Sequence, residues 1–188
     1  FSAMRKAMLN QVHNFDYSQN FLSHGYKEMV IEAAADGSHP IDKDALHIWP
    51  RKDFMFMALA NLDGSFTCTL YMAHEGENSF DSLQTKQEVE VFFNTHFPDA
   101  VPLMPNLVED YFENHSGSMV TVRCFPWAVD DQSILIGDSS HAIVPFFGQG
   151  MNSGFEDCFE DCELSVTATE NCLDDNTQYE VLLNITGL

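Results

Sequence analysis

The pattern of apolar and polar positions is clearest in a predicted β-hairpin. Residues 54–59 and 65–72 alternate in the way that strands do, and the tetrapeptide Asn61-Leu62-Asp63-Gly64 stands between them. This tetrapeptide is typical of a type I turn whose last residue, a glycine, takes the left-handed position of a bulge. A turn of this kind closes a three-residue loop, so we expect Asn61 to pair with Ser65.

The predicted register sorts the hairpin side chains into two faces, because successive side chains of a strand point to opposite sides. One face is uniformly apolar and is expected to pack in the core: Phe54, Phe56, Phe66, Cys68 and Leu70. The other face is mixed and fits either a second core layer or a pocket wall: Met55, Met57, Leu59, Thr67, Thr69 and Tyr71. From the pattern alone, the core interpretation of this mixed face is favoured.

The remaining segments are assigned from periodicity, turn residues and end residues. They predict helices at 1–10, 85–97, 107–112 and 151–164, and strands at 25–31, 45–49, 120–125 and 133–136. The helix at 85–97 has the clearest start, because Thr85 suits an N-cap and Glu88 completes a capping box. The sequence therefore predicts a mixture of helices and strands.

Composition sets bounds on size and on partners. The chain has 188 residues, of which 45% are hydrophobic, and this is enough for one domain with a sizeable core. It carries 29 acidic and 8 basic residues, a net charge of -21, which argues against nucleic acid and an anionic membrane surface as partners. The longest apolar run, residues 54–60, is too short to span a membrane.

The cysteines indicate neither a disulfide framework nor a metal centre. There are five of them at irregular spacing, which fits a reducing compartment. Cys158 and Cys162 lie one helical turn apart, but no second pair has metal-site spacing, so we expect no metal site.

Candidate chemistry lies in one segment around residue 140. Gly137-Asp138 follows an apolar strand, and an aspartate at a strand end can accept hydrogen bonds from sugar or ribityl hydroxyls. Gly148-Gln149-Gly150 precedes a predicted helix, where open backbone N–H groups suit an anion or a polar ring edge. Taken singly, each motif is weak: an N-cap is the default interpretation of Asp138, and an ordinary loop explains the glycines as well.

Together and in this order, the motifs from Gly137 to Asp157 resemble the second FAD-binding motif of the class A flavin monooxygenases. Four upstream segments are similar to the kynurenine 3-monooxygenase branch of that family: residues 24–28, 46–51, 61–70 and 93–103. The order and spacing of the branch are kept from residue 1 to about residue 158. The resemblance implies an α+β or α/β chain, with an antiparallel β-sheet substrate domain and part of a glutathione-reductase-like FAD-binding domain.

The resemblance also implies a division of the chain into four parts. Residues 1–12 would be a remnant of the FAD-binding domain, and residues 13–125 the β-sheet substrate domain with its helix at 85–97. Residues 126–164 would carry the second FAD motif as a strand, a loop and a helix. Residues 165–188 form a divergent tail to which the resemblance assigns nothing.

Members of this family are FAD-dependent hydroxylases, so the resemblance implies an NADPH-dependent monooxygenase of tryptophan catabolism and NAD biosynthesis. NADPH reduces the flavin, O₂ adds to give a flavin hydroperoxide, and one oxygen atom goes to the ring of L-kynurenine to give 3-hydroxykynurenine. That transfer needs no side-chain nucleophile, and we identify no catalytic residue. The alternatives are another class A aromatic hydroxylase or FAD-dependent oxidoreductase, and a non-catalytic remnant.

The resemblance assigns roles to two sets of residues. The cofactor set would hold the ribityl chain and the ring of FAD: Gly137, Asp138, Pro145, Gly148, Gln149, Gly150, Met151 and Asn152. The substrate set would line the pocket for the aromatic amino acid: Leu46, Met55, Met57, Leu59, Thr69, Tyr71, Pro145, Phe146 and Phe147. Five members of the substrate set lie on the mixed face of the predicted hairpin, and this agreement raises the pocket interpretation of that face above the core interpretation.

The sequence also departs from the family. The Gly-x-Gly-x-x-Gly unit for the ADP half of FAD is absent, and the C-terminal helices of the family are not recognisable beyond Cys158. Ser139-Ser140 stands where Ala-Ala is usual, and Ala60 where Pro is usual. We therefore expect a fragment that is inactive alone and does not bind FAD tightly. Its expected location is cytoplasmic in a bacterium, or the mitochondrial outer membrane in a eukaryote, where the family has an anchor that this chain lacks.

Overall fold

The computed structural model describes residues 2–129 and 133–159, which divide into two compact units. The sheet unit comprises residues 22–119, and the motif unit comprises the described residues among 1–21 and 120–188. The boundaries fall inside β1 (Asp16–Ile31) and β5 (Gly117–Phe125), so both strands contribute to both units. The domain limits expected at residues 12 and 125 stay predictions.

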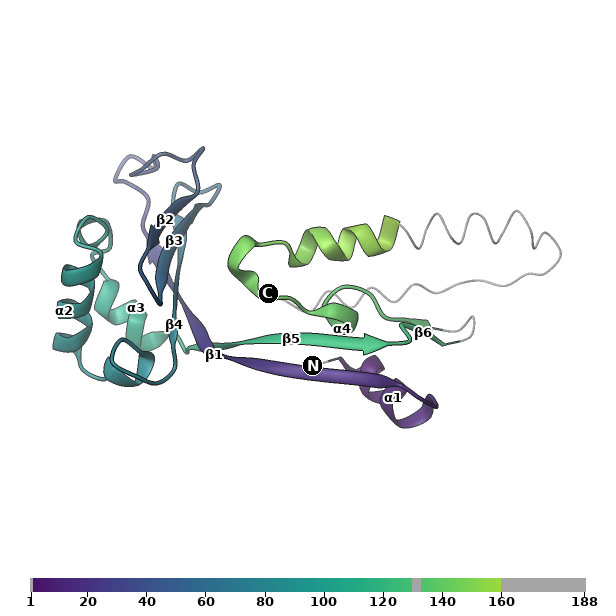
Figure 1. Ribbon diagram of the computed structural model, residues 1–188. Coiled ribbons are helices and arrows are strands. Elements are labelled where there is room, and N and C mark those ends of the chain that lie inside the picture. The colour runs from purple at the N-terminus through teal and green to yellow at the C-terminus, as the bar shows by residue number, and fades with distance from the viewer. Residues whose placement is uncertain (1, 130–132, 160–188) are drawn as a thin grey trace. The chain divides into compact units, whose positions relative to one another are not determined.

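A five-stranded sheet is the main element, with the strand order β2-β3-β4-β1-β5 (Figure 1). Besides β1 and β5 it contains β2 (His47–Pro50), β3 (Met55–Ala60) and β4 (Phe66–Ala73). The pairs β2/β3, β3/β4 and β1/β4 are antiparallel. The chain is therefore a mixed helix-and-strand protein with an antiparallel sheet, as its sequence predicts.

The hairpin of β3 and β4 has the predicted register. Met57 lies opposite Thr69. The Asn61 N–H donates to the Ser65 carbonyl at 2.8 Å, which closes the three-residue loop. Gly64 has a φ of 93°, the left-handed conformation that the bulge requires. The local turn chemistry therefore fixes which side chains share a face.

The apolar face of the hairpin forms the core of the sheet unit together with α2 (Lys86–His96) and α3 (Leu107–Glu113). All five side chains predicted for this face are buried: Phe54, Phe56, Phe66, Cys68 and Leu70. Phe56 is fully buried, and its ring centroid lies 5.8 Å from that of Phe93 on α2. Aromatic contacts of this kind join the helix to the sheet. The side chains on the opposite face of the hairpin are not part of this core.

The start of α2 follows its sequence signal. The Glu88 N–H donates to the Thr85 hydroxyl at 3.3 Å, and the Thr85 N–H donates to the Glu88 carboxylate at 2.8 Å. These bonds satisfy two backbone donors that the first helical turn leaves open, so the predicted capping box is confirmed. Short 3-10 turns flank α2 at Phe80–Ser82 and Val101–Leu103.

The motif unit is built from short elements. They are α1 (Ala3–Gln11), the strand pair β6 (Ala128–Val129) and β7 (Ser133–Ile134), and α4 (Asp138–His141). A 3-10 turn follows at Pro145–Phe147, and residues 150–159 are helical. The rest of the helix predicted at 151–164, with Cys162, and the tail at 165–188 lie outside the described residues.

The predicted strands differ from the observed ones at their ends, by one or two residues in β2, β3 and β4. β1 begins at Asp16 rather than at residue 25, and none of its residues from 16 to 23 is buried. Main-chain pairing holds this stretch, so it carries no apolar alternation from which it could be predicted. β5 begins three residues earlier than expected, and β7 ends two residues earlier. Among the described residues, no helix is long and apolar enough to cross a membrane.

Candidate functional site

The turn at Gly137 places Asp138 at the start of α4. Gly137 is the N-cap and has a φ of 56°, a conformation that favours glycine. Asp138 is the first helical residue, which corrects the default interpretation of this aspartate as an N-cap. Its carboxylate is exposed and has no hydrogen-bond partner among the described residues. A carboxylate in this situation can accept hydrogen bonds from a ligand.

Arg5 fixes the main chain of this turn. Its guanidinium donates to the carbonyls of Asp138 at 3.2 Å and Ser139 at 2.7 Å, and its Cζ lies 5.2 Å from the ring centroid of Tyr17. Arg5 is only 7% exposed. Sequence reasoning missed this contact because the partners lie 133 and 134 positions away. The buried Arg5 guanidinium therefore holds the main chain of the turn and leaves the Asp138 carboxylate unpaired.

The glycine loop borders that carboxylate. Gly148 ends the 3-10 turn in the left-handed conformation, with a φ of 62°, and its N–H donates to the Pro145 carbonyl at 3.0 Å. A Cβ added to Gly148 would meet nothing within 4 Å, and one added to Gly150 would meet only Asp138 Oδ1, at 3.8 Å. The structure therefore brings the two predicted motifs together: an open stretch of backbone lies beside an unpaired carboxylate oxygen.

Asp157 ties the Gly137 turn to the helix over 150–159. Its Oδ2 accepts a hydrogen bond from the Gly137 N–H at 2.6 Å and lies 2.8 Å from His141 Nε2. The Trp127 ring lies against His141, with the centroids 5.1 Å apart. A Cβ on Gly154 would lie 3.6 Å from the Gly137 Cα, so helix and turn approach closely. Sequence reasoning missed Asp157, since the phase of the helix relative to the turn has no local signal.

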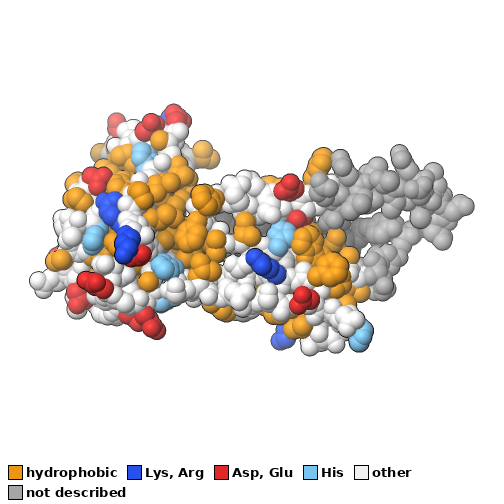
Figure 2. Space-filling model, in the orientation of Figure 1, with side chains coloured by type: hydrophobic (Ala, Val, Ile, Leu, Met, Phe, Trp, Pro, Cys, Tyr) orange, Lys and Arg blue, Asp and Glu red, His pale blue; other side chains and the backbone are white. Residues whose placement is uncertain are grey.

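The mixed face of the hairpin gathers the hairpin members of the substrate set. The observed register places on one face Met55, Met57, Leu59, Thr69 and Tyr71. Met57 is 7% exposed and Tyr71 is 6% exposed, whereas Leu59 is 51% exposed. Burial raises the pKa of the Tyr71 hydroxyl, which keeps it neutral. Apolar side chains gather over the strands of the sheet unit in Figure 2.

β1 adds three residues to this face that the sequence did not indicate. Tyr26, Glu28 and Val30 stand opposite residues of β4 that belong to the mixed face. The ring centroids of Tyr26 and Tyr71 are 6.4 Å apart. Because β1 and β4 are not adjacent in the sequence, no local pattern indicates that they pair. Glu28 brings an exposed carboxylate to a face that is otherwise apolar, hydroxyl-bearing or aromatic.

The other predicted residues lie in two further places. Leu46 stands just before β2 and is 51% exposed. Pro145, Phe146 and Phe147 form one 3-10 turn of the motif unit, where Phe147 is 85% exposed. A pocket shared by the hairpin face and this turn stays a prediction. Among residues 2–129 and 133–159, no cluster of side chains could hold a metal ion.

Comparison with known proteins identifies close relatives of the sequence. No family model matches the chain. A kynurenine 3-monooxygenase of Flavobacterium psychrophilum is 57% identical over 157 residues, which are 84% of this chain and 35% of the relative. One of Dictyostelium discoideum is 49% identical over 182 residues, which are 94% of this chain and 39% of the relative. The second match extends beyond residue 158, where we expected the likeness to end. The chain spans about a third of the length of these relatives.

Solved structures support the fold independently. A variant of 2-methyl-3-hydroxypyridine-5-carboxylic acid oxygenase superposes on 75% of this chain and 37% of its own, with a TM-score of 0.56 and 16% identity. A variant of Klebsiella pneumoniae HpxO, complexed with FAD, superposes on 80% of this chain and 38% of its own, with a TM-score of 0.59 and 15% identity. At this identity the likeness concerns the fold alone.

Proposed function

We propose, from the premise that this chain is a homologue of the kynurenine 3-monooxygenases over most of its length, that it forms part of an FAD-dependent monooxygenase. The reaction proposed is the NADPH-dependent hydroxylation of L-kynurenine by O₂ to 3-hydroxykynurenine. The observation that carries the proposal is the meeting of Asp138 with the glycine loop at Gly148 and Gly150. The location, cytoplasmic in a bacterium or at the mitochondrial outer membrane in a eukaryote, belongs to the same proposal.

The residues of the motif unit fit the flavin end of FAD. The loop offers backbone without side chains at Gly148 and Gly150, and the cofactor set around it is exposed or half-buried. The Asp138 carboxylate would accept hydrogen bonds from ribityl hydroxyls, and the loop N–H groups would face the polar edge of the ring. FAD, when bound and reduced, would supply the oxygen-activating chemistry of the reaction.

The mixed face of the hairpin fits an aromatic substrate. Leu59, which is 51% exposed, offers apolar surface to a ring, and the Thr69 hydroxyl can donate or accept a hydrogen bond. An apolar wall of this kind would exclude water from the reacting ring. Glu28, on the neighbouring strand, would give the face an acceptor for a substrate ammonium or amine.

A chimaera tests this function. It would carry the matched stretch of this chain in place of the corresponding stretch of the Flavobacterium psychrophilum relative. We expect stoichiometric FAD binding, kynurenine-stimulated NADPH oxidation and formation of 3-hydroxykynurenine. In the chimaera, Asp138→Asn should weaken FAD binding by about tenfold, since it removes a charged hydrogen-bond acceptor, whereas Asp53→Asn, an exposed aspartate in the sheet unit, should leave it unchanged.

Two results would contradict the proposal in different ways. Tight FAD binding without stimulation by kynurenine would indicate another aromatic hydroxylase. A folded chimaera that does not bind FAD would indicate a non-catalytic remnant. The 188-residue chain by itself is expected to bind FAD weakly, and tight stoichiometric binding by this chain would overturn that expectation.

A further inference from the structure

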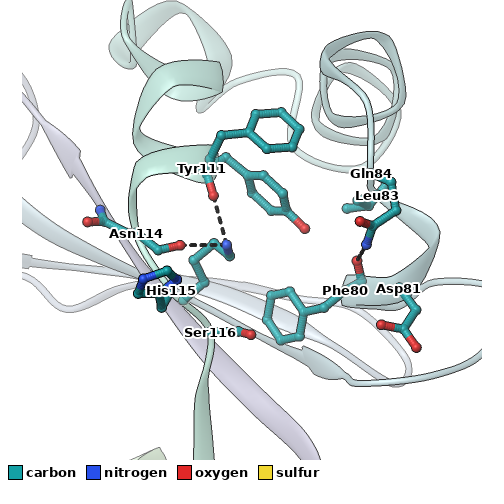
Figure 3. Close-up of a pocket in the computed structure, with 10 residues that line it drawn as sticks. Phe80, Asp81, Leu83, Gln84, Tyr111, Asn114, His115 and Ser116 are labelled. Carbon is teal, nitrogen blue, oxygen red and sulfur yellow. Dashed lines mark hydrogen bonds between the residues drawn. The ribbon is translucent and has the colours of Figure 1, made fainter.

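A pocket of about 210 Å³ lies in the sheet unit, away from the mixed face of the hairpin (Figure 3). Four side chains form its floor, and each is at most 8% exposed: Lys27 on β1, Tyr111 on α3, Phe80 in the 3-10 turn before α2, and Leu83 at the end of that turn. Polar side chains that include Gln84, His115 and Ser116 form an exposed rim. A buried floor with few polar groups and a polar rim is the usual composition of a small-molecule site.

Lys27 brings a buried cation to this floor. Its Nζ donates to the carbonyls of Tyr111 and Asn114, each at 2.7 Å, and lies 4.3 Å from the Tyr111 ring centroid. These carbonyls stand at the C-terminal end of α3, where the helix dipole favours a cation. Within residues 22–119, all of which are described, no carboxylate forms an ion pair with Lys27. An ammonium has three N–H donors, so one of them remains for a ligand.

Tyr111 brings an unpaired hydroxyl to the same floor. The residue is 2% exposed, and no described residue forms a hydrogen bond with its hydroxyl. In Figure 3 this hydroxyl points into the space that Phe80, Leu83 and Gln84 border. Among the described residues no buried side-chain nitrogen or oxygen lacks a hydrogen-bond partner, so this unpaired oxygen is accessible to a ligand. The capping of α3 explains why the Lys27 ammonium lies here, but it does not explain the Tyr111 hydroxyl.

We propose that this pocket binds a small organic monocarboxylate. Its oxygens would accept hydrogen bonds from Lys27 Nζ and the Tyr111 hydroxyl, and its hydrocarbon part would pack on Phe80 and Leu83. A protein cavity of about 150 Å³ takes up benzene, so this volume suits a ligand of the size of benzoate. Asp81 on the rim carries a negative charge that disfavours ligands with a second anionic group. The proposal does not depend on FAD.

Benzoate is the probe for this pocket, with neutral benzamide as its isosteric control. In an NMR titration of the ¹⁵N-labelled 188-residue chain, benzoate should shift amides around Lys27, Phe80 and Tyr111 with a saturable, millimolar Kd. Benzamide should bind at least tenfold more weakly. Tyr111→Phe should keep the fold, since it removes only an unpaired hydroxyl, and should weaken benzoate binding by about tenfold. Tyr26→Phe, on the opposite face of the sheet, is the matched control and should leave this binding unchanged.

Three results would overturn the proposal. The first is equal binding of benzamide and benzoate, which would exclude recognition of the charge. The second is shifts confined to amides around Met57 and Thr69, which would place the aromatic probe on the hairpin face instead. The third is unchanged benzoate binding in folded Tyr111→Phe.

Lys27→Met should abolish benzoate binding. Its fold should be checked by circular dichroism, because the Lys27 ammonium also caps α3.

Discussion

Replacement of Asp157 by alanine should loosen the Gly137 turn without unfolding the chain. The Asp157 carboxylate accepts the Gly137 N–H at 2.6 Å and pairs with His141 Nε2 at 2.8 Å. Both contacts disappear in Asp157→Ala. Asp157→Asn keeps one oxygen for the Gly137 N–H and loses the second carboxylate oxygen, so it separates the effect of the hydrogen bond to Gly137 from that of the contact with His141.

The expected magnitude follows from burial and hydrogen-bond type. A hydrogen bond to a charged group contributes about 1.5–3 kcal/mol. The side chains of His141 and Asp157 are 21% and 15% exposed, so they are not fully buried and the lower part of that range applies. We therefore expect the opening of the turn to become about 2 kcal/mol easier in Asp157→Ala, which is about 30-fold in an equilibrium constant. For Asp157→Asn we expect about fivefold or less, because the hydrogen bond to Gly137 remains.

Hydrogen exchange of the Gly137 amide measures this opening directly. Its exchange rate should rise about 30-fold in Asp157→Ala, because the amide loses its acceptor. Asp138→Ala is the matched control: the neighbouring carboxylate has no partner among the described residues, so exchange at Gly137 should stay within about twofold. A Gly137 exchange rate in Asp157→Ala within twofold of the unmodified chain would refute the role given to Asp157.

The other predictions concern the sheet unit and are measured by urea denaturation. Thr85→Ala should lower the free energy of unfolding by about 1 kcal/mol through loss of the capping box, whereas Thr85→Ser keeps the capping hydroxyl and should not lower it. Gly64→Ala should cost more than about 1 kcal/mol, since φ is 93° and the new Cβ would lie 2.4 Å from the Gly37 carbonyl; unchanged stability would contradict this. Burial raises the pKa of Cys68 from 9.0 and that of Tyr111 from 10.0, each to about 12. The folded state therefore holds these protons more tightly than the unfolded chain does. The contribution of the two groups to the free energy of unfolding should be fully present below pH 9 and should decline toward pH 12. The decline should be less steep in Tyr111→Phe.

The features that the sequence predicts best are those with a local cause. The loop length of the hairpin sets its register, so the face shared by Met57 and Thr69 follows from the turn between residues 61 and 64. The capping box of α2 joins residues three positions apart, and side-chain chemistry alone indicates it. In both cases the signal and the contact lie within one short segment.

The features that the sequence did not predict depend on non-local pairing. Tyr26 and Glu28 reach the mixed face only because β1 pairs with β4, and that pairing leaves no mark within either strand. The first half of β1 has no buried residue, so periodicity could not reveal it. Arg5 contacts carbonyls that lie 133 and 134 positions away. Such contacts are set by tertiary packing, which local propensity does not report.

The contrast between two aspartates shows how the structure separates support from binding. Asp157 is half-buried, and its carboxylate is used by a backbone N–H and by His141. Asp138, in the same motif, is exposed and unpaired among the described residues, beside backbone that carries no side chain. A buried carboxylate needs partners within the protein, whereas an exposed one is hydrated and can exchange that water for a ligand. The same contrast holds in the sheet unit, where the Asn114 carbonyl accepts a hydrogen bond from Lys27 while the accessible Tyr111 hydroxyl has no partner among the described residues. The accessible unpaired groups of the two units are therefore the ones that our two proposals assign to ligands: one suits the cofactor proposed from the relatives, and the other suits the carboxylate proposed for the pocket.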